Sequence, residues 1–205
     1  MSDTKKQNID NKLVLIGDSK VGKTSLISRF VCGLFDQNMT STDGVSYAIK
    51  KIEYKHLNIT LDLNIWDTAG QEKYKPLTKF LYKDAPMIIL VYDTTSKESF
   101  DNLKYYWYEK IKENIEGNEE DIVFGIAGNK SDLYDNEEVP EEEARNFAKS
   151  INAIFALTSA KDNDGIEELF RNIGNKYLEL NFQEKVSETQ KENFPNIEIQ
   201  KEEHF

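Results

Sequence analysis

The chain has 205 residues, enough for one domain with a sizeable core but too few for two domains of ordinary size. Hydrophobic residues make up 39% and the net charge is −11, so we expect a globular protein that binds neither nucleic acid nor, unaided, anionic membranes. Its one cysteine, Cys32, excludes a disulfide framework and fits a reducing, cytoplasmic setting.

Strands and helices are expected to alternate between two polar ends. Residues 1–10 are predicted to form a flexible arm, 11–180 one domain, and 181–205 a polar flexible tail. The hydrophobic patterns predict strands at 13–16, 45–54, 59–66, 87–92, 122–127 and 154–157, and helices at 23–31, 96–114, 140–150 and 165–180. Cys32 is expected to be a small buried side chain at a helix end.

This order predicts an α/β fold: a doubly wound, mostly parallel six-stranded sheet with one antiparallel edge strand and helices on both faces. Ligands of such sheets bind at the carboxyl ends of the strands. Four polar motifs described below directly follow predicted strands, after Ile16, Trp66, Ala127 and Leu157, so we expect these motifs to meet in one site.

A phosphate-binding loop is predicted between the first strand and the first helix, where the chain reads Gly17-x4-Gly22-Lys23-Thr24. Glycine lets backbone N–H groups turn toward phosphate oxygens, and the helix N-terminus adds a positive dipole. Lys23 is expected to reach the β- and γ-phosphates, and the Thr24 hydroxyl to bind Mg²⁺. The alternative is an ordinary glycine-rich turn with a solvent-facing lysine, but the full pattern in its strand–loop–helix context favours a P-loop NTPase.

The predicted nucleotide contacts in this loop are Ser19, Lys20, Val21, Gly22, Lys23, Thr24 and Ser25. The loop alone does not distinguish ATP from GTP.

Two further motifs complete the predicted site. Asp67 ends an apolar strand, as a carboxylate that holds Mg²⁺ through water should, and Gly70 and Gln71 follow it. The Gly70 N–H is expected to face a γ-phosphate, and Gln71 to orient the attacking water. In Asn129-Lys130-x-Asp132, the Asp132 carboxylate can accept from both the ring N–H and the exocyclic amine of guanine, a donor pair that adenine lacks.

These motifs, together with Thr42 and Thr158-Ser159-Ala160-Lys161, resemble in order and spacing the guanine-nucleotide motifs of the Ras-like small GTPases. The resemblance covers roughly residues 11–180. Within that superfamily the chain is most similar to the Rab branch, through Asp43-Gly44-Val45-Ser46-Tyr47, Leu63-Asn64-Ile65-Trp66 and Lys73-Tyr74-Lys75-Pro76-Leu77.

The resemblance implies a GTP-hydrolysing switch, slow alone and accelerated by an activating protein, with a role in vesicle traffic. It implies that Thr42 binds Mg²⁺, that Phe35 packs against the guanine, and that Ser159, Ala160 and Lys161 form the base-binding loop, with the Ala160 N–H donating to O6. Switch regions at 35–47 and 70–83 would bind an exchange factor, a GTPase-activating protein and effectors. We expect a monomer.

Two departures from the family pattern stand out. Lys20 occupies a position where the family usually has a small residue; it either places extra charge near the β–γ bridge or points to solvent while its backbone binds. The chain has no cysteine after Cys32, so we expect no C-terminal prenylation and membrane association only through partners.

Three alternatives stay open at this point. One is a guanine-nucleotide-binding scaffold with negligible hydrolysis, and another is a small GTPase that signals outside membrane traffic. The third is an ATP-dependent phosphotransferase, against which Asn129 and Asp132 argue.

Overall fold

A computed structural model describes residues 7–38, 45–68, 82–115 and 117–182. Its six strands are β1 (Gln7–Ile16), β2 (Val45–Tyr54), β3 (Ile59–Thr68), β4 (Met87–Asp93), β5 (Val123–Asn129) and β6 (Ile154–Thr158). They form one sheet in the order β2-β3-β1-β4-β5-β6, in which only β2 runs antiparallel to its neighbour. The predicted fold class is confirmed.

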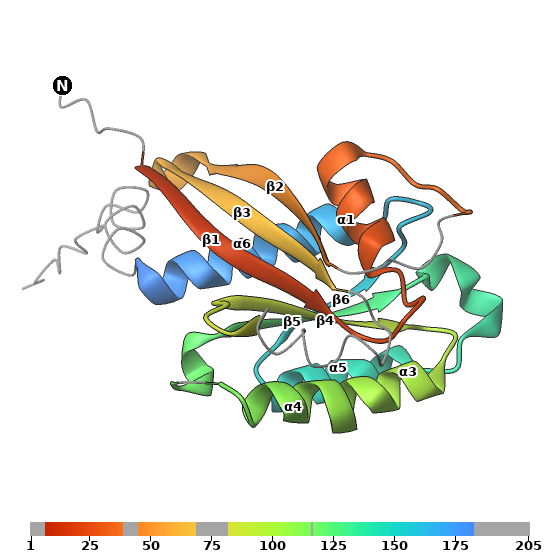
Figure 1. Ribbon diagram of the computed structural model, residues 1–205. Helices are drawn as coiled ribbons and strands as arrows, with labels where there is room; N and C mark the ends of the chain where they lie inside the picture. The colour runs from red at the N-terminus through yellow and green to blue at the C-terminus, as the bar shows by residue number, and fades with distance from the viewer. Residues whose placement is uncertain (1–6, 39–44, 69–81, 116, 183–205) are drawn as a thin grey trace, which may run out of the picture.

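Helices cover both faces of this sheet (Figure 1). One layer contains α1 (Lys23–Cys32) and α6 (Ile166–Asn181), which enclose one apolar core with β1, β3 and β5. The other contains α3 (Lys97–Asn102), α4 (Glu109–Lys112) and α5 (Glu141–Ser150), over a second core. Short 3₁₀ turns lie at η1 (Lys55–Leu57), η4 (Glu119–Asp121) and η5 (Ser131–Asn136). Within the described ranges, none of the helices is long and apolar enough to cross a membrane.

The sequence prediction was wrong about where β1 begins. Residues 7–10, expected in the arm, are part of β1 and pair in parallel with β3, from Gln7 opposite Ile59 to Asp10 opposite Asp62. Ile9 is buried against the core while Asp10 is exposed, so this stretch has one apolar and one polar face. A strand of that kind carries too few apolar residues to be recognised in isolation.

Cys32 also differs from expectation. It ends α1 on the exposed side instead of in the core. The chain then turns at Gly33, whose φ of 72° is the left-handed conformation typical of a helix C-terminus.

The helix predicted at 96–114 is present but not regular. Ser96 caps its N-terminus by accepting a hydrogen bond from the Ser99 N–H at 3.2 Å. Between α3 and α4 lies a π-helical segment, η3 (Leu103–Tyr108). The apolar face that predicted the helix is buried, including Trp107 and Ile111. The hydrophobic period therefore identified the helix but not its change of winding.

Candidate functional site

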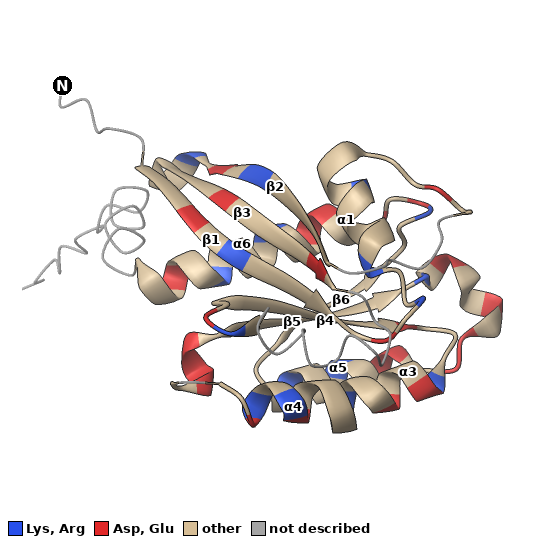
Figure 2. Ribbon diagram, in the orientation of Figure 1, with Lys and Arg blue, Asp and Glu red and all other residues tan. Residues whose placement is uncertain are grey.

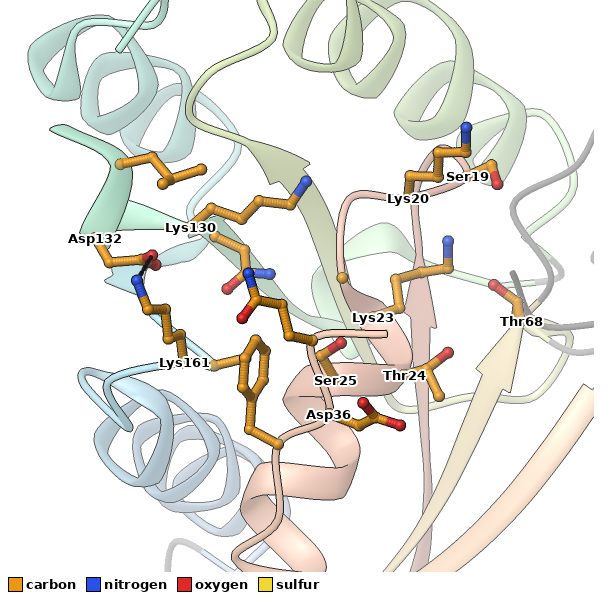
Figure 3. Close-up of a pocket in the computed structure, with 16 residues that line it drawn as sticks. Ser19, Lys20, Lys23, Thr24, Ser25, Asp36, Thr68, Lys130, Asp132 and Lys161 are labelled. Carbon is orange, nitrogen blue, oxygen red and sulfur yellow. Dashed lines mark ion pairs between the residues drawn. The ribbon is translucent and has the colours of Figure 1, made fainter. Parts of the chain in front are cut away.

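A cavity of about 370 Å³ opens at the carboxyl ends of the strands (Figure 3), within the range expected for a small-molecule site. Most of the predicted binding residues line it: Ser19, Lys20, Gly22, Lys23, Thr24, Ser25, Phe35, Asn129, Lys130, Asp132, Ala160 and Lys161. They come from the β1–α1 loop, the first turn of α1, the segment after α1, the end of β5 with the start of η5, and the loop after β6. The topology thus brings together segments far apart in the sequence.

The lining is positively charged in an acidic protein. Four lysines line the cavity against two aspartates: Lys20, Lys23, Lys130 and Lys161, with Asp36 and Asp132. Figure 2 shows basic positions beside acidic ones at this end of the sheet. The net charge of the whole chain is −11. A local excess of positive charge in such a chain favours an anionic ligand.

Glycine is required at the turn into α1. Gly22 has a φ of 96°, and a Cβ there would lie 2.2 Å from the Asn129 amide nitrogen. That nitrogen donates to the Val21 carbonyl at 2.8 Å, while the Thr158 hydroxyl donates to the Asn129 side-chain oxygen at 3.3 Å. Asn129 therefore joins the phosphate loop to the ends of β5 and β6, and its side chain is almost fully buried.

Lys23 is the first residue of α1, and its side chain reaches back to the start of the preceding loop. Its side-chain ammonium donates to the carbonyls of Gly17 at 2.8 Å and Asp18 at 2.7 Å. Burial lowers the pKa of Lys23 to about 8, because the charged form loses its hydration, although the carboxylates of Asp67 and Asp18 partly oppose this. The hydrogen-bond acceptors of this buried ammonium are two neutral carbonyls, and the nearby acids offset its charge only in part. Its positive charge is therefore available to attract an anion.

The oxygen donors expected to hold Mg²⁺ lie beside this lysine. The Thr24 hydroxyl donates to Asp67 Oδ2 at 2.5 Å, and the Ser46 hydroxyl lies 3.4 Å from the same oxygen. Asp67 is only 1% exposed. Hydroxyl and carboxylate oxygens are the ligands Mg²⁺ prefers, and one or two protein ligands suffice when phosphates supply the others. The donor set at Thr24 and Asp67 therefore fits Mg²⁺.

At the other end of the cavity, the Asp132 carboxylate is fixed from two sides. The Ser159 hydroxyl donates to Asp132 Oδ1 at 2.7 Å, and the Lys161 ammonium lies 3.6 Å from Oδ2 (Figure 3). Lys130, with a φ of 68°, directs its ammonium to Asp93 Oδ2 at 2.5 Å. The contacts from Ser159 and Lys161 hold the Asp132 carboxylate in one orientation.

An arginine that the sequence did not single out supports the end of the cavity formed by Ala160 and Lys161. Arg29 Nε donates to the Ala160 carbonyl at 2.8 Å, Nη2 to the Lys161 carbonyl at 3.0 Å, and Nη1 to the Gly33 carbonyl at 2.7 Å. The Phe35 ring lies 5.9 Å from its guanidinium carbon. One side chain of α1 thus links the loop after β6 to the segment that carries Phe35. The only feature of the sequence that could have indicated this role is the presence of an arginine beside the apolar residues of α1.

Not every predicted contact lines the cavity. Val21 packs in the core and contributes its carbonyl to Asn129, and Ser159 is buried behind Asp132. Thr42, Gly70 and Gln71 lie outside the described residues. Conversely, the cavity is lined by four residues that were not predicted, Asp36, Gln37, Thr68 and Leu133. Each lies within two positions of a predicted residue, so proximity in the sequence was the available signal.

The mostly parallel sheet, the glycine-dependent loop at the start of α1 and this cavity define a P-loop nucleotide-binding protein. Residues 12–180 match the model of the Ras family. The chain belongs to the Ras family, and its relatives place it in the Rab branch of the Ras-like GTPases.

Three relatives illustrate the similarity. Rab-22A of Homo sapiens is 42% identical over 165 residues, 80% of this chain and 82% of the relative. The GTP-binding protein ypt1 of Schizosaccharomyces pombe is 41% identical over 159 residues, 78% of this chain and 75% of the relative. RabJ of Dictyostelium discoideum is 40% identical over 171 residues, 83% of this chain but 64% of the relative. The chain therefore spans slightly less than two thirds of RabJ.

Proposed function

We propose that this protein binds GTP and GDP with Mg²⁺, hydrolyses GTP slowly, and acts as a molecular switch in intracellular vesicle traffic. One observation carries the proposal: a single cavity holds the phosphate loop at one end and the oriented Asp132 carboxylate at the other. Membership of the Rab branch supports the traffic role by analogy.

Asp132 selects the base. Its two oxygens accept from the ring N–H and the exocyclic amine of guanine, while the Ala160 N–H donates to O6. Adenine offers no such donor pair, so an ATP complex would lack the two hydrogen bonds that guanine donates to this carboxylate. Ser159 and Arg29 contribute indirectly, because they hold the carboxylate and the Ala160 loop in place.

The β1–α1 loop binds the phosphates through its backbone N–H groups, the α1 N-terminus and Lys23. Thr24 would hold Mg²⁺ directly and Asp67 would hold it through water, and the ion would supply positive charge beside the phosphates. We assign to Thr42 and Gly70 the sensing of the γ-phosphate, and to Gln71 the orientation of the attacking water.

Partners would bind through the segments 35–47 and 70–83, which we propose as the switch regions for an exchange factor, a GTPase-activating protein and effectors. At the end of the first of these segments, Tyr47 is half exposed near the start of the edge strand β2. We propose a monomer in the cytoplasm, peripheral on endomembranes when a partner recruits it.

Nucleotide binding tests this proposal directly. Fluorescently labelled GDP and GTP should bind in a Mg²⁺-dependent manner, and ATP should not compete. Asp132→Asn should weaken GDP binding about 10- to 100-fold, the loss of hydrogen bonds to a charged group. Asp135→Asn is the matched control, since Asp135 is exposed and outside the cavity lining. Competition by ATP equal to that of GTP would refute guanine selectivity.

Hydrolysis is tested separately. Single-turnover release of phosphate from GTP should be measurable for the wild type and slower for Gln71→Leu. Equal rates for the two proteins would refute the role assigned to Gln71. Binding without phosphate release, even with activators that supply an arginine, would instead favour a scaffold that binds guanine nucleotides.

A further inference from the structure

The phosphate loop contains an acidic residue whose position calls for an explanation. Asp18 directly follows Gly17, and its carbonyl oxygen is one of the two that accept from the Lys23 ammonium. A carboxylate here would repel bound phosphates if it turned toward them. Yet Asp18 is absent from the cavity lining, although its neighbours Ser19 and Lys20 are part of it.

Two donors from a distant helix hold this carboxylate. Asn102 Nδ2 donates to Asp18 Oδ2 and Trp107 Nε1 donates to Asp18 Oδ1, both at 2.7 Å. Trp107 is 3% exposed, and a buried indole N–H normally requires an acceptor. Both carboxylate oxygens are therefore engaged on the side of α3 and η3. We call these three residues the Asp18 clasp.

The π-helical winding of η3 explains how both donors reach one carboxylate. Asn102 and Trp107 are five positions apart, and in a regular α-helix residues four apart, not five, lie above one another. A π-helix forms i→i+5 hydrogen bonds, so residues five apart are brought onto the same side. Asn102 directly precedes η3 and Trp107 lies within it. Such segments are rare, and they occur frequently at functional sites.

We propose that the Asp18 clasp is a positioning device for the nucleotide phosphates: Asn102 and Trp107 keep the Asp18 carboxylate turned away from the cavity. By the same contacts they fix the Gly17–Asp18 backbone, whose carbonyls hold Lys23. The inference rests on the proposed nucleotide binding. Because the released carboxylate would act through its charge, loosening the clasp should weaken GTP binding more than GDP binding.

A double-mutant cycle tests the proposal. Trp107→Phe should weaken GTP binding about tenfold, the loss expected for one hydrogen bond to a charged group, and GDP binding less. In an Asp18→Asn background, which has no charge to restrain, the same substitution should change GTP affinity less than about twofold. Equal losses in the two backgrounds, or no loss in either, would overturn the proposal, since a packing role of the indole does not depend on the Asp18 charge.

Controls separate the clasp from folding and from nucleotide binding itself. Asn102→Leu removes the other donor and should show the same dependence on Asp18, so the test survives if Trp107→Phe does not fold. Trp66→Phe, the matched control, should leave both affinities unchanged. It also identifies the Trp107 indole signal in ¹⁵N NMR spectra, because the chain has only two tryptophans. Without nucleotide, Asp18→Asn should shift the Trp107 indole signal, and an unshifted signal would overturn the clasp. If the wild type binds neither GDP nor GTP, both the proposed function and the clasp proposal are overturned.

Discussion

Replacing Arg29 with methionine would remove three hydrogen bonds while keeping a side chain of comparable length. The guanidinium donates to the carbonyls of Ala160, Lys161 and Gly33, and so links the base loop to the segment leading to Phe35. None of these atoms is expected to touch the nucleotide. Any loss of affinity in Arg29→Met must therefore come from a base loop that is less well positioned.

The size of the effect follows from the burial of the contacts. The bond to Ala160 is partly buried, whereas those to Lys161 and Gly33 are exposed, so water replaces the latter two at little cost. One partly buried hydrogen bond from a charged donor contributes about 1.5–3 kcal/mol. If that free energy positions the loop, GDP affinity falls about 10- to 150-fold. Arg29→Lys, which can donate to only part of this set, should be intermediate.

Dissociation of labelled GDP, followed by fluorescence after mixing with excess unlabelled GDP, measures the effect. We expect faster release from Arg29→Met with the same Mg²⁺ dependence, because the metal ligands lie at the other end of the cavity. Arg171→Met is the matched control: Arg171 forms an exposed pair with Glu167 on α6. Unchanged GDP release from Arg29→Met, despite a lower free energy of unfolding, would show that Arg29 supports the fold but not the site.

Three further predictions concern the loop and its helix. GDP affinity, measured by titration calorimetry, should fall as pH rises above about 8, by up to about tenfold per pH unit. The reason is that Lys23 loses its proton in this range in the unliganded protein, whereas a bound phosphate keeps it charged. The variant Lys23→Met should not show this pH dependence. Lys20→Gly should raise the free energy of unfolding, measured in urea, by about 1 kcal/mol, because Lys20 has a φ of 67°. A free energy of unfolding below that of the wild type would show that the backbone at Lys20 is not strained. Exposed Cys32 should react with a thiol reagent in the native protein; reaction only after denaturation would contradict its placement.

Features encoded in contiguous residues were predictable from the sequence. The phosphate loop requires a strand, a short glycine pattern and a helix in succession, and each is recognisable locally. The parallel topology then places Asn129, Asp132 and Ala160 at the same end of the sheet, because the carboxyl ends of parallel strands lie together.

Features that depend on side-chain contacts between distant segments were not predictable. Arg29 reaches a carbonyl 131 positions away, and Trp107 reaches a carboxylate 89 positions away. Neither contact has a sequence pattern, because its geometry depends on how the layers pack. The π-helical winding of η3 was missed for a related reason: it changes the period by one residue within an otherwise helical pattern. The roles of Thr42, Gly70 and Gln71 stay predictions.

The position of Asn129 has a consequence for nucleotide release. Its side chain bonds the phosphate loop through Val21 and the end of β6 through Thr158, and Gly22 packs directly on its amide. Pulling the phosphate loop away from β5 would therefore stretch a bond that also anchors the base end of the cavity. We therefore expect the two ends of the site to loosen together, so that a partner that binds only one end would release the whole of the proposed nucleotide.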